Sequence, residues 1–178
     1  LPPGVLNVIT NAMEDAPAGQ TDLLPFVQRV FETIGFAKVS TSAEHARQLG
    51  YLRPFDAITM NRDRQIADAK ALALERVRER YRTPAPRTAI RVGGEGVLSA
   101  LELGVHLAWR AGRITDHDAL VGRVLANVLA GGRLPHQTTV GEEYLLDLER
   151  EAFLKLCGER KTLERVQHTL KTGKPLRN

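Results

Sequence analysis

Residues 93–132, GGEGVLSALELGVHLAWRAGRITDHDALVGRVLANVLAGG, form the stretch of this chain that decides its fold. Apolar side chains recur there every three or four residues, which is the spacing of one face of an α-helix. Gly112 ends the first apolar series, and Thr115 precedes the second, which Gly131 stops. Because threonine caps helix starts and glycine favours helix ends, the stretch predicts two consecutive helices.

The same periodicity predicts a mostly α-helical chain outside this stretch. Alanine and leucine dominate and aromatic residues make up only 5%, a composition that favours helices over sheets. We expect about seven helices in all, with five beyond the central pair over residues 22–35, 41–49, 61–80, 141–157 and 161–171. Residues 56–60, DAITM, are the best candidate for a short strand, and we expect one or two strands at most.

Proline and glycine divide the chain into three predicted regions. Residues 1–21 form an irregular lead, with a turn at 1–4, a short strand or helical turn at 5–9 and a loop over 13–20. Residues 22–83 form a helical region that holds the candidate strand. Pro84 and Pro86 then disfavour helix, so a C-terminal helical region begins there and spans 84–178. Because the chain begins with leucine in a proline-rich segment, we expect a cut or processed N-terminus.

Composition limits the classes of function. The chain has 178 residues, of which 43% are hydrophobic, enough for one cored domain or one with a small appendage. Its 25 lysines and arginines are scattered among 21 acidic residues, so we do not expect nucleic acid as the partner. No apolar run approaches the ~20 residues needed to cross a bilayer, and no signal segment is visible. We therefore expect a cytoplasmic protein without a membrane partner.

The sequence offers no persuasive catalytic or metal site. One cysteine excludes an internal disulfide, and Cys157 is best interpreted as a small half-buried apolar residue. The five histidines show no i,i+4 pair of the zinc-binding kind. Residues 93–96, GGEG, lack the lysine of a Walker loop and the third glycine of a dinucleotide fingerprint. We interpret them as a flexible helix start, with weak anion attraction as the alternative.

Four blocks of sequence, taken in order, carry a resemblance to a known family. They are residues 25–34 (PFVQRVFETI), 37–44 (AKVSTSAE), 49–53 (LGYLR) and 171–178 (KTGKPLRN). Together they resemble the C-terminal crotonase-like (enoyl-CoA hydratase/isomerase) region of bacterial 3-hydroxyacyl-CoA dehydrogenases, from about residue 21 to the end. The resemblance implies the C-terminal helical part of a crotonase-like fold, with residues 1–21 as a remnant of the crotonase core.

The resemblance also implies a function for the parent enzyme. That enzyme would act in fatty-acid β-oxidation on acyl-CoA with NAD, whereas this chain lacks the family's catalytic and NAD-binding motifs and should hold no cofactor. Helices in this position cover the acyl-CoA pocket and form subunit contacts, so a homo-oligomer is expected. The family's basic tail, near the CoA phosphates, matches Lys171 and Lys174 here, although Gly173 stands where the family has a basic residue.

A second interpretation belongs to another class. The chain would then be an all-α module that binds protein or nucleic acid. Salt-dependent binding of duplex DNA would support this alternative, as would lysines and arginines gathered on one helix face. No such gathering is evident in the sequence.

Overall fold

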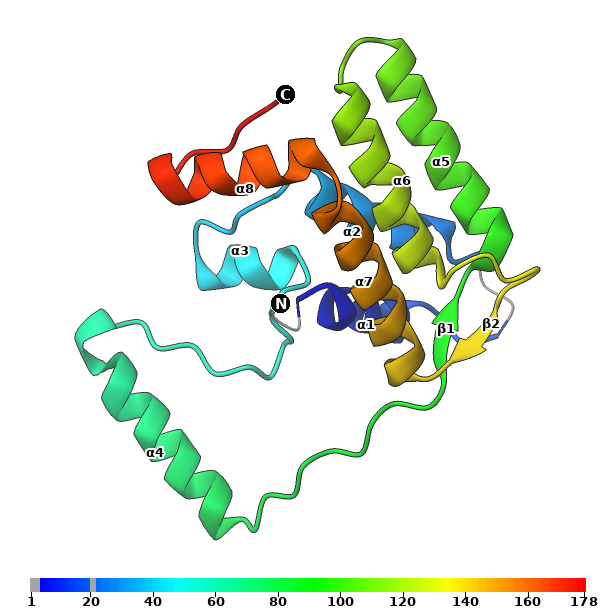
Figure 1. Ribbon diagram of the computed structural model, residues 1–178. Coiled ribbons are helices and arrows are strands. Elements are labelled where there is room, and N and C mark those ends of the chain that lie inside the picture. The colour runs from blue at the N-terminus through cyan, green and yellow to red at the C-terminus, as the bar shows by residue number, and fades with distance from the viewer. Residues whose placement is uncertain (1–3, 20–21) are drawn as a thin grey trace. The chain divides into compact units, whose positions relative to one another are not determined.

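The computed structural model describes residues 4–19 and 22–178, which contain eight α-helices, one 3₁₀ helix and two short strands (Figure 1). The prediction of a mostly helical chain is confirmed. The chain divides into two compact units, which we call unit 1 (residues 1–38 and 87–178) and unit 2 (residues 39–86). The helical region predicted over 22–83 is thus divided at 38/39, and its first helix belongs with the C-terminal half of the chain.

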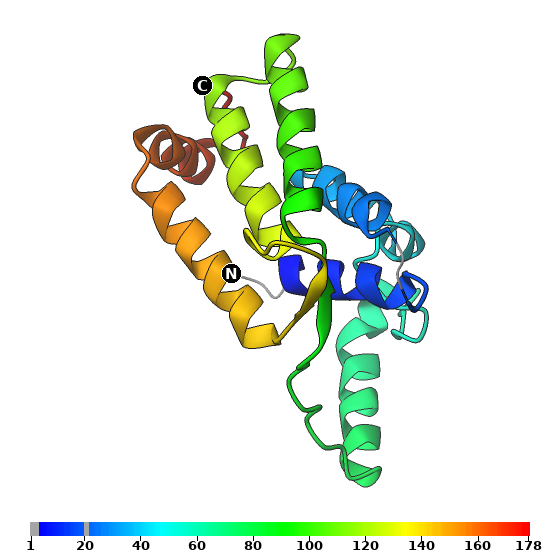
Figure 2. The same cartoon turned by 90° about the vertical axis from the view of Figure 1, so that its right-hand side faces the viewer.

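The centre of unit 1 is the predicted helix pair. Helices α5 (Gly94–Arg110) and α6 (Asp116–Ala130) lie side by side in Figures 1 and 2, and α2 (Leu24–Gly35) contacts both. Leu98 of α5 and Leu129 of α6 are fully buried, and each contributes about 2 kcal/mol by leaving water. Pro25 lies in the first turn of α2, where its missing N–H would have no partner within the helix.

The start of α5 is tightly packed. Gly94 has φ +62°, and a Cβ built there would lie 2.6 Å from the Leu134 carbonyl oxygen and 2.7 Å from that of His136. The Glu95 N–H donates a hydrogen bond of 2.7 Å to the Leu134 oxygen. At the end of α6, Gly131 has φ +81°, and its Cβ would lie 2.5 Å from that of Val92. The prediction of a flexible helix start at residues 93–96 is therefore wrong. Glycine is needed at Gly94 and Gly131 because neighbouring segments pack too closely for a side chain.

Two three-residue strands close one end of unit 1. Strands β1 (Ile90–Val92) and β2 (Thr138–Val140) pair antiparallel, with Ile90 opposite Val140. Ile90 and Val92 of β1 form a buried cluster with Leu6 and Leu145. The candidate strand at residues 56–60 is wrong, since that segment is irregular. Residues 56–60 have no neighbouring strand to pair with among the described residues, and a strand needs one. Strands β1 and β2 were missed because three residues are too few to show an alternating pattern.

Residues 4–15 form a helix, α1 (Gly4–Asp15), where we expected an irregular lead. Leu6, Ile9 and Met13 recur at helical spacing and are buried, but the asparagines and the threonine between them are poor helix formers and obscured the pattern. Tertiary packing overrides that weak propensity. The turn predicted at residues 1–4 falls mostly outside the described residues.

An arginine from β1 caps the end of α1. The Arg91 guanidinium donates hydrogen bonds of 2.6 Å to the carbonyl oxygens of Met13 and Pro17, and a further one to that of Ala16. The last carbonyls of a helix have no partner within the helix, so a cation at this position satisfies them and the helix dipole together. Arg91 thus fastens α1 to a strand more than 70 residues later in the chain.

The last two helices match the predicted ones closely. Helix α7 (Glu142–Cys157) contacts α6 and α1, and Cys157 is half-buried, as expected. Gly158 separates it from α8 (Arg160–Thr172), which ends at Gly173 in the left-handed conformation, φ +68°. All 13 residues of α8 are among the described ones, and none of them is buried.

Unit 2 contains α3 (Ala43–Gln48), the 3₁₀ helix η1 (Arg62–Arg64) and α4 (Gln65–Arg78). Ser42 caps α3 by accepting the His45 N–H, so this helix begins at Ala43, two residues later than the predicted start at 41. Asn61 begins the longer helical stretch, as expected. Helix α4 is described in full and buries no residue. No helix within the described part of the chain is long and apolar enough to cross a membrane.

Candidate functional site

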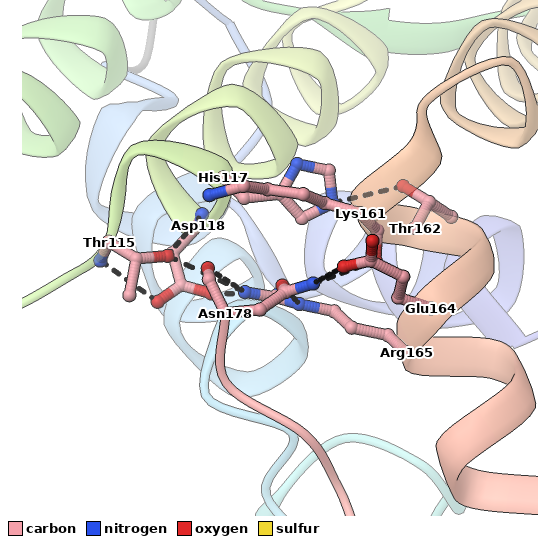
Figure 3. A network of polar contacts seen from close by, with 8 residues as sticks. All are labelled: Thr115, His117, Asp118, Lys161, Thr162, Glu164, Arg165 and Asn178. Atoms are coloured by element: carbon pink, nitrogen blue, oxygen red, sulfur yellow. Dashed lines mark hydrogen bonds and ion pairs between the residues drawn. The ribbon is translucent and has the colours of Figure 1, made fainter.

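Polar side chains gather where the start of α6 meets α8 and the end of the chain. Figure 3 shows this group, which we call the C-terminal cluster: Thr115, His117, Asp118, Lys161, Thr162, Glu164, Arg165 and Asn178. All of these residues belong to unit 1, and they come from three separate stretches of the sequence. The cluster adjoins the basic tail that the sequence selected as a binding candidate.

An ion pair joins α8 to α6 within the cluster. Arg165 Nη1 lies 2.8 Å from Asp118 Oδ1, and both side chains are about a fifth exposed, at 22% and 23%. Burial raises the pKa of Asp118, but the Thr115 N–H and the Arg165 guanidinium stabilise the charged form more strongly, so the pKa is lowered overall. Thr115 and Asp118 also complete the predicted capping at the start of α6 as a full capping box.

The tail after α8 folds back along the helix. Arg165 Nε donates a 2.8 Å hydrogen bond to the side-chain oxygen of Asn178. The Asn178 amide nitrogen in turn donates to Glu164 at 2.9 Å and to the Lys161 carbonyl oxygen at 3.3 Å. Residues 173–178 are therefore held at their far end by side chains of α8.

A buried histidine completes the contact between the two helices. His117 is only 4% exposed, and its Nε2 lies 3.0 Å from Thr162 Oγ1. Burial lowers the pKa of His117, and the positive charges of Arg165 and Lys161 lower it further. The folded chain therefore binds a proton at His117 less readily than the unfolded chain does.

The free energy of unfolding should therefore fall as the pH drops through about 6.5. The folded chain holds His117 with a lowered pKa, so in that window the unfolded chain binds more protons and acid favours unfolding. Asp118, whose pKa is also lowered, adds a second fall below about pH 4, where the unfolded chain again takes up the proton first. Urea denaturation over this pH range measures both effects.

The control for this prediction is a matched pair of histidine variants. His117→Asn should flatten the fall near pH 6.5, whereas His106→Asn, at an exposed position of α5, should retain it. If the His117→Asn protein showed the full acid-dependent fall, the buried imidazole would not be its source.

The structure places Lys171 and Lys174 at the solvent-exposed end of α8. Lys171 lies in the last turn of the helix, and neither lysine forms an ion pair with a described residue. The backbone around Lys174 is fixed, because its N–H donates to Thr172 Oγ1 at 3.1 Å and its carbonyl accepts from Thr169 Oγ1 at 3.3 Å. Both ammonium groups are thus available to an anion, on a well-defined backbone.

Sequence reasoning missed a second basic feature, in unit 2. A shallow depression of about 450 Å³ lies at the end of α4, lined by Ala73, Arg76, Val77, Arg80 and Tyr81. Arg76 pairs with Glu79 at 3.1 Å, whereas Arg80 forms no ion pair with a described residue. The run of arginines over residues 76–82 was the signal that could have indicated it.

Other parts of the described chain offer little chemistry. An internal space of about 10 Å³ beside Glu149 is lined mainly by apolar side chains and has room for about one water molecule. Burial there raises the pKa of Glu149. Within residues 4–19 and 22–178, no group of three or more histidine, cysteine or acidic side chains could hold a metal ion.

Comparison with known proteins adds one relative. The chain is 45% identical over 157 residues, or 88% of its length, to a probable 3-hydroxyacyl-CoA dehydrogenase of Bacillus subtilis (strain 168). The match spans only 20% of that protein, so this chain corresponds to about a fifth of its relative. No family model matches the chain. No solved structure matches it either.

Proposed function

We propose that this chain is a segment of a fatty-acid β-oxidation enzyme of the 3-hydroxyacyl-CoA dehydrogenase/enoyl-CoA hydratase type. The similarity to the Bacillus protein, 45% over nearly nine-tenths of this chain, carries the proposal. The crotonase-like resemblance of the four sequence blocks supports the finer assignment. In this proposal the segment covers the acyl-CoA pocket and forms subunit contacts, and the NAD and acyl-CoA chemistry belongs to other parts of the enzyme.

The exposed apolar side chains of α4 support the covering role. Ile66 is 85% exposed, Val77 is 73% exposed and Leu74 is 48% exposed, on a helix that buries none of its residues. Apolar side chains at helical spacing ordinarily pack against another element, because their transfer out of water is favourable. The proposed partner of this face is the remainder of the enzyme or a second subunit.

The absence of catalysis is tested directly on the purified chain. We expect neither hydration of crotonyl-CoA nor NAD-dependent oxidation of 3-hydroxybutyryl-CoA above the rate in buffer. The spectrophotometric assays at the thioester and NADH absorption bands measure both reactions. Robust turnover of either substrate would overturn the proposal that this segment is non-catalytic.

The proposed contact with CoA phosphates predicts a charge-dependent affinity. The double variant Lys171→Gln/Lys174→Gln should bind coenzyme A about three- to tenfold more weakly than the unchanged chain, because each lost ammonium removes up to about 1 kcal/mol of attraction at an exposed site. Isothermal titration with coenzyme A at low salt measures the change.

Lys155→Gln is the matched control for that titration. Like Lys171, Lys155 is an exposed lysine in the last turn of its helix, here α7. Its loss alters the net charge without touching the tail, so it should leave the affinity almost unchanged. Equal weakening by Lys155→Gln would show a general charge effect and contradict a site at Lys171 and Lys174.

A further inference from the structure

The basic excess of the chain lies almost entirely in its last 19 residues. Residues 160–178 contain six lysines or arginines and one acidic residue, whereas residues 1–159 contain 19 basic and 20 acidic residues. The formal charge is therefore +5 in α8 and its tail and −1 in all that precedes them. This asymmetry indicates an acidic partner for the segment.

An exposed apolar stripe runs along the same helix. Leu163, Val166 and Leu170 recur at i, i+3 and i+7 and are 47%, 50% and 82% exposed. Arg160 and Lys171 lie beside this stripe, since the first precedes Leu163 by three residues and the second follows it by eight.

Side chains outside the stripe already bind α8 to α6. Arg165 pairs with Asp118, and Thr162, which lies four residues before Val166 at the edge of the stripe, contacts His117. Successive helix residues turn by about 100°, so the Arg165 side chain points well away from the stripe centred on Leu163 and Leu170. The C-terminal cluster therefore holds α8 by the side that carries Arg165, and the apolar stripe remains between 47% and 82% exposed.

We propose that α8 and residues 173–178 form a peripheral attachment site for a bilayer surface rich in anionic phospholipids. A helix with a narrow apolar stripe, flanking cations and a polar remainder is the kind that lies in the plane of a membrane interface. Its leucines enter the boundary of the acyl chains, and its cations meet the lipid phosphates. The 13 residues of α8 rise only about 20 Å, less than the ~30 Å hydrocarbon core, so the helix lies along the surface.

The structure favours a lipid surface over a protein partner. The stripe spans seven residue steps, about 10 Å, whereas a stable protein interface buries about 800 Å² on each side. A second copy of α8 would bring like charges together. A bilayer surface places an apolar layer directly beneath a layer of phosphates, which matches the leucines and lysines of this one helix. The expectation of no membrane partner rested on the lack of a spanning run, a criterion that says nothing about attachment to the surface.

Sedimentation with vesicles tests this proposal on the whole chain. We expect the chain to sediment with phosphatidylcholine vesicles that contain phosphatidylglycerol, to remain in solution with phosphatidylcholine alone, and to dissociate as salt is added. Leu163→Gln/Leu170→Gln should lower the vesicle partition coefficient about tenfold, because both side chains lose their transfer into the apolar boundary. This pair also separates the inference from the proposed coenzyme A contact, which needs the cations but not the leucines.

Leu103→Gln/Leu107→Gln is the matched control. These leucines of α5 are similarly exposed, at 57% and 59%, but lie outside the basic segment. Their replacement should leave vesicle binding unchanged, with circular dichroism confirming that both double variants are folded. Failure of the unchanged chain to sediment at low salt would overturn the proposal, as would α8 variants that bind as well as the control. Capture of an acidic protein without any vesicle binding would also overturn it and assign the face to that protein.

Discussion

Gly94→Ala should lower the free energy of unfolding of unit 1 by about 3 kcal/mol or more. A left-handed conformation costs an alanine about 1–2 kcal/mol relative to glycine. The new Cβ would also lie 2.6 and 2.7 Å from two backbone oxygens, which cannot rotate aside as a side chain would. Relief requires the segment around Leu134 and His136 to move, and this would strain the hydrogen bond from the Glu95 N–H. Chemical denaturation followed by circular dichroism measures the loss.

Gly96→Ala supplies the matched control two residues later in the same helix. A Cβ there meets no atom within 4 Å, and the glycine has an ordinary helical conformation. Because alanine is the better helix former, this variant should be more stable by about 0.5–1 kcal/mol. Opposite signs for the two substitutions would support the close approach at Gly94. A mild effect at Gly94, similar to that at Gly96, would contradict it.

Arg165→Met should lower the free energy of unfolding by about 2 kcal/mol. The substitution keeps the apolar stem of the side chain but leaves the partly buried Asp118 carboxylate without its cation. It also removes the hydrogen bonds from Arg165 to Asn178, so that Asn178 is held against α8 through its contacts with Glu164 and Lys161. We expect α8 and the tail to lose protection first, which amide hydrogen exchange resolves by segment.

A double-mutant cycle with Asp118→Asn isolates the ion pair from these other contacts. Asparagine retains an oxygen for the Thr115 N–H, so the helix cap is largely kept. We expect a coupling energy between the two substitutions of about 1 kcal/mol, since both side chains are still partly solvated. Strict additivity would mean that the pair contributes nothing, and that the loss on removing Arg165 comes from the tail alone. Arg160→Met, at an 85% exposed position of the same helix, is the control and should change stability little.

The sequence was sufficient for the helices that carry both a strong apolar period and clear end signals. Thr115 and Gly131 bound α6 as predicted, and the helix pair at the centre of unit 1 follows directly. Helix α1 was not predicted because its own helix propensity is weak. Burial of Leu6 and Ile9 and the cap from Arg91, which is distant in sequence, stabilise it instead. Strands β1 and β2 escaped because their pairing joins residues almost 50 positions apart.

The candidate site shows the same division between local and distant signals. Lys171 and Lys174 could be selected because they belong to one short run of sequence. The contact of His117 with Thr162 joins residues 45 positions apart, and the pairing of Asp118 with Arg165 is similarly distant, so neither could be inferred from spacing. The concentration of positive charge in residues 160–178 can be counted from the sequence alone, but the expectation that the basic residues are scattered along the chain overlooked it. What this charge could bind depends on which side of α8 faces α6, and only the structure shows that.

The cap that Arg91 places on α1 has a consequence for the order in which the protein can fold during synthesis. Within this stretch of sequence the ribosome releases α1 and α2 before unit 2, and the strand that carries Arg91 only afterwards. Until then the exposed carbonyls of α1 and the apolar side chains around Leu6 have no permanent partner. Helices α1 and α2 therefore remain without this cap until the whole inserted unit has been synthesised, and during that interval they are accessible to chaperones and proteases.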